Sequence, residues 1–469
     1  MKYRHHDIDI PNDHPFANCK LNRKPNAEVL TQIVQNYADG FVLSINGEWG
    51  TGKTTFMKMW AAYLKQQHIN SIYFNAWEND FISDPMVAIL GELKQLTTSK
   101  VESTLNTILD IGSKIAIKTI PALAKGIVKH YYGDDLAEVI QNTLNAGSDI
   151  FKTEIIEYED KKKNLETFKV ELQTYVNETN PDHPLIFIVD ELDRCRPDYA
   201  VEVLERIKHF FSIKGIVFVL SIDKEQLCNS IRGYYGSDRI NAEEYIRRFI
   251  DVEYLLPNPN IESYCTYLYE YFEIKDFFNQ KERSQYKFSN DEYSLLKIAV
   301  EIITAQNYSL RQIEKLFAHF RLILCSCKCN QNVLPVLTFM LICIRTTSHI
   351  YYRKIVNKQL SLDDLAQLIN NVFPNHIFDS PSEHERPLSM WGLGQLFYHY
   401  SISFTTYTHT IDPIKTDPQT GKPSLTFKIN NIDHDMLART IYDCGKVHIQ
   451  SSIWKSIIRS IDLLNPIEE

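Results

Sequence analysis

One segment of the sequence, INGEWGTGKTTFMKMW from Ile45 to Trp60, gathers three of the chain's 16 glycines around a lysine and several threonines. Its spacing, Gly47-x-x-x-x-Gly52-Lys53-Thr54, is that of a Walker A loop. Glycines allow the backbone to turn its N–H groups toward phosphate oxygens. A lysine at this position contacts the β- and γ-phosphates, and the following hydroxyl is a Mg²⁺ ligand. The nucleotide-binding residues expected from this pattern are Gly47, Gly50, Thr51, Gly52, Lys53, Thr54 and Thr55.

Two acids follow a second apolar run, in PLIFIVDELDRCRPD. The run Ile186 to Val189 is typical of a buried strand, and it ends in Asp190 and Glu191. Parallel sheets bind phosphates at the carboxyl ends of their strands. We therefore expect Asp190 to hold Mg²⁺ through water, and Glu191 to act as the catalytic residue that activates the attacking water. The alternative is an acid-rich surface turn.

A third apolar run, IVFVLSID, ends in Ser221 and Asp223. Either side chain is placed to sense the γ-phosphate, so both are candidates, Ser221 as catalytic and Asp223 as nucleotide-binding. For Asp223 a second interpretation stays open, because an aspartate before a helix is a common N-cap.

The segments around these residues alternate between strands and helices. Strands are expected at 41–46, 71–75, 185–189, 215–221 and 252–256, and helices at 53–67 and 198–211. This alternation predicts an α/β fold with a parallel sheet. Between about 80 and 180 the apolar spacing is helical, which indicates a large helical insertion between the glycine loop and the acids.

The chain beyond the sheet changes character. Residues 1–259 are expected to form the core, 260–330 a helical lid, and 331–469 a mostly helical C-terminal region. Within that last region FTTYTHTI and LTFKI flank a turn at 417–421. They predict a β-hairpin within about 402–429.

Composition restricts the class of protein. Hydrophobic residues make up 44% of the chain and the net charge is −9, so nucleic-acid binding is possible but gains no support from net charge. Nine cysteines, an odd number, and a polar N-terminus without a signal-peptide pattern favour a cytoplasmic location. Two apolar stretches, 111–129 and 333–344, are interrupted by lysines or too short to span a membrane, so no transmembrane span is expected.

In combination, the motifs resemble the KAP family of P-loop NTPases. GEWGTGKTT resembles the family's extended Walker A, which adds Glu48 and Trp49 to the nucleotide-binding residues. YFNAWEND, VDELDRC, VFVLSIDKEQL and EEYIRRFIDVEYLLP follow in the family's order over about residues 20–260. The resemblance implies an ATPase with a helical insertion, of a soluble bacterial type. Bacterial members are similar to phage-exclusion and other defence proteins. The chain has no Asn-Lys-x-Asp guanine motif, so ATP is the expected nucleotide.

Three arginines are further candidates. Arg247 and Arg248 resemble the segment from which ring-forming ATPases extend an arginine to a neighbouring subunit's nucleotide, where a guanidinium stabilises the transferring phosphoryl group. Their alternative is pairing with Glu243, Glu244 or Asp251. Arg311, in NYSLRQIEKLF, resembles the arginine with which a helical lid reaches the nucleotide; its alternative is a surface pair with Glu314.

These expectations leave three functions open. The first is Mg²⁺-dependent ATP hydrolysis by a homo-oligomer that drives or gates a partner effector protein, in antiviral defence. The second is a slow nucleotide-dependent switch that assembles a partner. The third is a DNA-stimulated translocating ATPase. No nuclease, protease or deaminase constellation is found in the C-terminal third.

Overall fold

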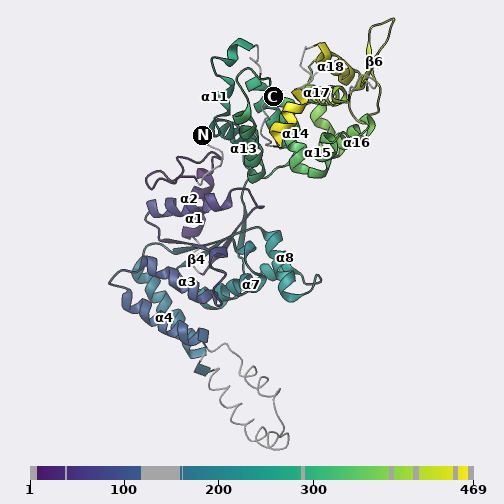
Figure 1. Cartoon of the computed structure of the whole chain (residues 1–469). Coiled ribbons are helices and arrows are strands. Elements are labelled where there is room, and N and C mark those ends of the chain that lie inside the picture. Colours follow the sequence, from purple (N-terminus) through teal and green to yellow (C-terminus); the bar gives the residue numbers. More distant parts are fainter. Residues whose placement is uncertain are drawn as a thin grey trace, which may run out of the picture. The chain divides into compact units, whose positions relative to one another are not determined.

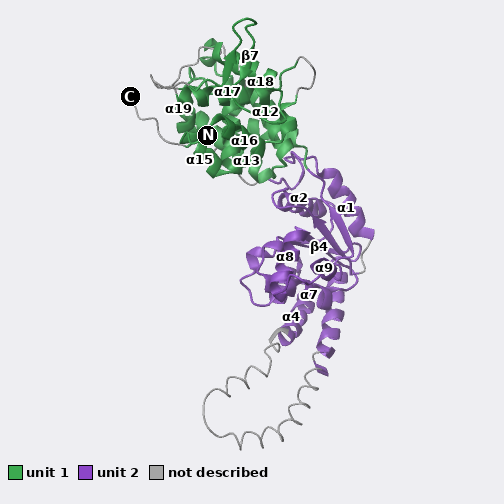
Figure 2. Ribbon diagram, turned by 90° about the vertical axis from the view of Figure 1, so that its right-hand side faces the viewer, with its two compact units in different colours: residues 1–7, 259–469 green, residues 8–258 purple. Residues whose placement is uncertain are grey.

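The computed structural model describes residues 8–36, 40–117, 159–160, 162–286, 291–379, 385–404, 411–446 and 453–462. The chain divides into two units (Figure 2). Following the order of the chain, the first unit in this text is Ile8–Asn258, purple and keyed as unit 2 in the figure, and the second is formed by the residues from Pro259 onward, green and keyed as unit 1.

A five-stranded parallel sheet lies at the centre of the first unit (Figure 1). Its strand order is β2-β3-β4-β1-β5, and neighbouring strands are parallel throughout. The strands are β1 (Val42–Asn46), β2 (Ser71–Asn75), β3 (Leu185–Asp190), β4 (Ile216–Ile222) and β5 (Val252–Leu255). All five lie within a residue or two of the positions expected from the sequence, since buried parallel strands are continuous apolar runs.

Two separate apolar cores cover the faces of this sheet. One contains alternate strand residues such as Ile45, Ile188 and Val219 together with Phe56 and Trp60. Its helices are α1 (Lys24–Asn36) and α2 (Lys53–Gln66). Because side chains alternate across a strand, the intervening strand residues form the other core. The α/β fold expected from the sequence is therefore confirmed.

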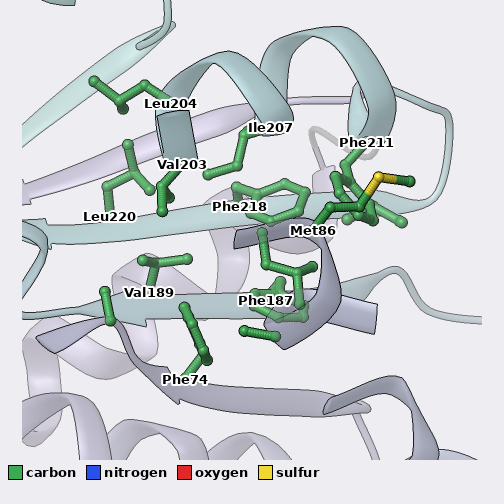
Figure 3. Close-up of a cluster of buried hydrophobic side chains, with 14 of the residues drawn as sticks. Phe74, Met86, Phe187, Val189, Val203, Leu204, Ile207, Phe211, Phe218 and Leu220 are labelled. Carbon is green, nitrogen blue, oxygen red and sulfur yellow. The ribbon is translucent and has the colours of Figure 1, made fainter. Parts of the chain in front are cut away.

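A row of aromatic side chains runs through the second core. Phe74, Phe187 and Phe218 come from three neighbouring strands and contact one another in sequence, at centroid distances of 6.2 Å for the first pair and 5.2 Å for the second (Figure 3). Helix α7 (Pro197–Arg206) and the following turn of π-helix, Ile207–Phe211, cover them. The second core also includes residues of α8 (Lys224–Tyr235) and α9 (Ala242–Ile246).

The segment between β2 and β3 is mostly helical in the residues that the structure describes. It contains α3 (Pro85–Leu93), α4 (Glu102–Ile117) and a helix over 162–179. Buried residues of all three pack on the second core, for example Ile89, Ile108 and Phe168. The middle of the expected insertion, 118–158, lies outside the described residues.

The second unit is mostly helical. Its longest helices surround α14 (Pro335–Thr347), which is buried from Pro335 through Ile344. This is the apolar stretch at 333–344, which packs against protein as expected. The other helices are α10 (Ile261–Tyr271), α11 (Ile274–Phe278), α12 (Asp291–Gln306), α13 (Leu310–Ser326), α15 (His349–Val356), α16 (Leu362–Val372), α17 (Leu388–Ser403), α18 (His434–Lys446) and α19 (Ile453–Ile461).

The hairpin of this unit is shorter than the sequence pattern indicated. Its antiparallel strands are β6 (Ile414–Thr416) and β7 (Pro423–Leu425), around the expected turn. Of the expected second strand, only Leu425 belongs to the ladder. Phe427 instead stacks on Phe397 at 4.3 Å, so its packing on α17 competes with strand pairing. Residues 405–410 of the expected first strand lie outside the described residues.

None of the helices in the described ranges is long and apolar enough to cross a membrane. All nine cysteines are free thiols.

Candidate nucleotide-binding site

A row of polar side chains crosses three neighbouring strands at their carboxyl ends. Asn75 of β2 is in register with Asp190 of β3, and Asp190 is in register with Ser221 of β4. All three lie two residues beyond apolar side chains that belong to the α2 face of the sheet. The row therefore lies on the face from which α2 begins. Strand order places β4, and with it Ser221, between the glycine loop after β1 and the acids after β3.

The glycine loop connects β1 to α2 and leaves backbone donors unpaired. Gly50 and Gly52 have φ angles of 82° and 81°, which a residue with a Cβ rarely adopts. Gly52 is the N-cap of α2 and gives it no side-chain cap. Within the described residues, the N–H groups of Gly50, Gly52, Lys53 and Thr54 donate to no protein acceptor. Unpaired donors at a helix N-terminus are suited to an anion.

Lys53 is buried and folds back over the loop. Its Nζ donates to the carbonyl oxygen of Gly47 and, at 3.0 Å, to that of Glu48. Burial lowers the pKa of Lys53, while the charges of Asp193, Asp223 and Asp190 act in the opposite direction. The ammonium therefore has little contact with solvent and lies near three carboxylates.

The two acids after β3 have different surroundings. Asp190 is 1% exposed, and its carboxylate accepts from the hydroxyl of Tyr73 at 2.8 Å and from the N–H of Glu191 at 3.0 Å. Burial, followed by the charge of Asp190, raises the pKa of Tyr73, so the tyrosine remains a donor. Asp190 is thus held as a fixed acceptor at the end of the sheet.

Glu191 adopts a left-handed backbone conformation with a φ of 59°. One carboxylate oxygen lies 2.8 Å from NH1 of Arg194 and 3.3 Å from the hydroxyl of Thr54. The other accepts from Asn75 at 3.4 Å. Strained backbone of this kind is concentrated at functional sites, and here it turns the carboxylate toward the first turn of α2.

Ser221 and Asp223 differ in their availability. Ser221 is fully buried, and its hydroxyl has no hydrogen-bond partner among the described residues. Asp223 is the N-cap of α8, accepting from the N–H of Gln226 at 3.3 Å, and its other oxygen accepts from the N–H of Trp49 at 3.1 Å. This geometry favours the capping alternative for Asp223, with an added contact to the glycine loop.

Four residues at the site were not predicted from the sequence, namely Tyr73, Asn75, Asp193 and Arg194. The indole N–H of Trp49 donates to Asp193, a buried carboxylate whose pKa burial raises. The guanidinium of Arg194 also lies 5.6 Å from the ring centroid of Trp77. Asp193 and Arg194 stand within VDELDRC, and Tyr73 and Asn75 alternate along β2. The sequence signal for these four residues is their polar side chains, next to the acids after β3 and on one face of β2.

The other loop candidates lie at the edges of this cluster. The Thr51 hydroxyl donates to the carbonyl oxygen of Glu48 at 2.8 Å, which closes the loop on itself. Glu48 and Trp49 are exposed, and Thr55 is half-buried on α2.

Neither Arg247 nor Arg248 has a hydrogen bond or ion pair with a residue of this cluster in the described part of the chain. Arg247 is 65% exposed and pairs with Glu244 at 3.3 Å, one of the partners named as an alternative. The carbonyl oxygen of Arg248 accepts from Lys208 at 3.0 Å. Arg311 is an exposed residue in the first turn of α13, in the other unit. A role for any of them at a nucleotide remains a proposal.

The residues present fit a nucleotide with Mg²⁺. Unpaired backbone donors and a buried lysine suit phosphate, and the Thr54 hydroxyl lies 3.3 Å from a carboxylate oxygen of Glu191. Hydroxyl and carboxylate oxygens are ligands that Mg²⁺ prefers. Among the described residues no three His, Cys, Asp or Glu side chains form a metal-binding group. A nucleotide site does not need one, since Mg²⁺ there is held by one or two protein ligands plus phosphates.

A family model described as the KAP family P-loop domain matches residues 23–325. The chain belongs to the KAP family. The match covers all residues of the candidate nucleotide site and extends into the last turn of α13, which confirms the resemblance found in the sequence. It also confirms that the parallel sheet and its glycine loop form a P-loop NTPase fold.

Among proteins of described function, the KAP chain is similar to the Phage T7 exclusion protein of Escherichia coli (strain K12). The two are 20% identical over 308 residues, covering 61% of this chain and 37% of that protein. The chain thus spans little more than a third of the relative's length.

Two solved structures align along most of the KAP chain. The first is the ORC2 protein of Aeropyrum pernix, with 15% sequence identity, a TM-score of 0.31, and coverage of 98% of this chain and 97% of that chain. The second is the Drosophila ORC bound to DNA, with 12% sequence identity, a TM-score of 0.32, and coverage of 96% of this chain and 87% of that chain.

Proposed function

We propose that this KAP chain hydrolyses ATP with Mg²⁺ and uses the reaction to drive or gate a partner protein. The observation that carries the proposal is the polar row Asn75–Asp190–Ser221, in register across three strands on the face from which α2 presents Lys53 and Thr54. Each member of this row has a role in phosphoryl transfer that its chemistry explains.

Binding comes from the loop. The unpaired N–H groups of Gly50 and Gly52 and the ammonium of Lys53 would contact phosphate oxygens. Thr54 and Asp190 would hold Mg²⁺, which would supply positive charge to the phosphates. For this to happen, Lys53 exchanges its contacts with the carbonyl oxygens of Gly47 and Glu48 for phosphate. The exchange is favourable because a charge-assisted bond to phosphate is stronger than one to a neutral carbonyl.

Water activation falls to Glu191, and γ-phosphate sensing to Ser221. The Glu191 carboxylate accepts the proton of the attacking water once its contact with Thr54 is released, and Asn75 keeps it oriented. The hydroxyl of Ser221 is fully buried and has no protein partner among the described residues, so its contact with a γ-phosphate oxygen requires that the surrounding side chains move to expose it.

The cellular role is a further part of this proposal. The name of the Escherichia coli relative supports a role in excluding phage, so we place the chain in bacterial antiviral defence, in the cytoplasm. We further propose a homo-oligomer in which Arg247 or Arg248 reaches the nucleotide of a neighbouring copy, and a separate effector protein as the partner.

Turnover of purified variants tests the chemical proposal. Lys53→Ala should lose tight Mg-ATP binding, because the phosphate cradle loses its charge. Glu191→Gln should bind ATP and retain it, with hydrolysis reduced by roughly 10²-fold or more, the scale of losing a general base. Normal turnover in both variants would refute the assignment; normal turnover in Glu191→Gln alone would mean that another group activates the water.

The same assay separates the alternatives for the reaction's use. We expect appreciable turnover of the parent without DNA and no strong stimulation when duplex DNA is added. Very slow turnover with tight ATP binding would favour a switch, and strong stimulation by DNA would favour a translocating enzyme.

A further inference from the structure

Arg23 lies just before α1 and is almost fully buried, with 3% of its surface exposed. Burial lowers its pKa to about 10, so it remains protonated at neutral pH. No carboxylate pairs with it in the described part of the chain. A buried charge without a counter-ion is expensive, which requires an explanation from the groups that do contact it.

Those groups are carbonyl oxygens, two of them in the glycine loop. NH2 of Arg23 donates to the carbonyl oxygen of Thr51 at 2.8 Å, and NH1 donates to that of Gly52 at 3.5 Å. A third, longer contact of 3.5 Å joins NH2 to the carbonyl oxygen of Pro257, just after β5. The guanidinium also lies 5.9 Å from the ring centroid of Phe56 on α2. Arg23 therefore contacts two successive carbonyl oxygens at the end of the glycine loop.

The peptide groups link these carbonyls to the phosphate donors. The carbonyl of Thr51 shares its peptide with the N–H of Gly52, and the carbonyl of Gly52 shares its peptide with the N–H of Lys53. In a trans peptide the C=O and N–H point in opposite directions. Arg23 is thus on the far side of the two peptides whose N–H groups have no protein acceptor within the described ranges.

We propose that Arg23 is a positioning residue for phosphate binding, which orients the Thr51–Gly52 and Gly52–Lys53 peptides and polarises their N–H groups toward the nucleotide. A hydrogen bond accepted by a carbonyl strengthens the bond that the same peptide donates. The positive charge behind the loop further attracts phosphate, and bound phosphate in turn compensates the buried guanidinium. This inference rests on the proposed function, because it assigns Arg23 to the same ATP site.

The test compares Arg23→Met and Arg23→Lys with a matched control, Thr31→Val. Thr31 is a buried residue of α1 that accepts from the indole of Trp60 at 3.0 Å, so its loss weakens the packing of α1 on α2 without touching the loop. Mg-ATP affinity is measured by calorimetry well below each variant's unfolding temperature. Turnover is measured at saturating ATP.

Arg23→Met should raise the Kd for Mg-ATP by about tenfold or more, the scale of losing a charged hydrogen bond. Turnover at saturation should stay within about threefold of the parent, because Arg23 does not touch the reacting atoms. Arg23→Lys should lose less affinity, since its ammonium keeps the charge but lacks the fork that bridges two carbonyls. Thr31→Val should lower the unfolding temperature and leave the Kd unchanged.

A Kd for Arg23→Met no higher than that of Thr31→Val overturns the inference and leaves the proposed ATPase intact. If Arg23→Met does not fold, Arg23→Lys decides: a Kd equal to the parent's refutes the role. If the parent itself does not bind Mg-ATP, the proposed function fails, and this inference fails with it.

Discussion

At the scale of single residues, the site consists of side chains that hold one another in place. Trp49 illustrates this, because its indole donates to Asp193 and its backbone N–H donates to Asp223. Two carboxylates, one after β3 and one after β4, therefore anchor a loop residue that is itself 47% exposed. An exposed tryptophan in a phosphate loop would otherwise be free to move.

Trp49→Phe should weaken Mg-ATP binding by about tenfold, because it removes a hydrogen bond to a buried carboxylate. An aromatic ring and the backbone bond to Asp223 remain, but the loop loses one of its two anchors and Asp193 loses a donor. Trp77→Phe is the matched control, since Trp77 is also half-exposed and its ring can still lie beside Arg194. Calorimetric titration measures both; equal affinities in the two variants would show that the Trp49 contact does not support the loop.

At the scale of elements, α17 is a buried helix that carries polar side chains into the interior of the second unit. Gln395 and His399, four residues apart, are both buried, and each has a side-chain atom without a partner in the described part of the chain. The helix also packs tightly on α18, since a Cβ on Gly394 would lie 2.5 Å from Cγ2 of Thr440. Burial lowers the pKa of His399 to about 4, so the imidazole is neutral in the folded chain.

That shift predicts acid sensitivity of the second unit. Below the unfolded pKa of about 6.5 the unfolded chain gains a proton that folded His399 does not take up until about pH 4. The unfolded state then binds more protons, so stability falls as the pH falls. From pH 7 to pH 5 the loss is about 2 kcal/mol.

His399→Leu should reduce this acid loss, measured as the change in urea unfolding free energy between pH 7 and pH 5. His376→Leu, which replaces an exposed histidine, is the control and should keep the parent's slope. An unchanged slope in His399→Leu would show that other groups cause the acid sensitivity.

At the scale of the whole molecule, our proposal is that a neighbouring copy of the chain completes the nucleotide site with an arginine. Arg247 and Arg248 lie at the end of α9, and the surface pair of Arg247 with Glu244 contributes under about 1 kcal/mol. Such a pair is weak enough to be exchanged for a nucleotide on another copy. Supplying the arginine in trans would make hydrolysis depend on assembly, a contribution of about 10³ to 10⁵ in rate where such residues act.

Mixing two inactive proteins tests this arrangement. Lys53→Ala keeps its arginines, and the double variant Arg247→Ala, Arg248→Ala keeps its own phosphate loop. Each should be nearly inactive alone, and the mixture should regain part of the ATPase activity. Absence of recovery, in proteins shown by native mass spectrometry to co-assemble, would exclude the trans role.

The sequence by itself determined the glycine loop, the two acids and all five strands of the sheet. Local chemistry explains this success: a phosphate loop needs glycines at fixed spacing, and a buried parallel strand needs a continuous apolar run. The register of Asn75 with Asp190 and Ser221 was not accessible in this way, because register depends on which strands become neighbours.

Only the tertiary structure identified the residues that act by positioning other residues. In the sequence, Asp223 fits either a γ-phosphate sensor or a helix N-cap. Its two contacts in the structure, with the N–H groups of Gln226 and Trp49, favour the N-cap. The hairpin strands shortened because Phe427 packs on α17 instead of extending the ladder. Arg23 lies 28 residues from Thr51, whose carbonyl it contacts. Spacing patterns report periodic local structure, whereas contacts of this kind arise only when α1, the loop and β5 come together.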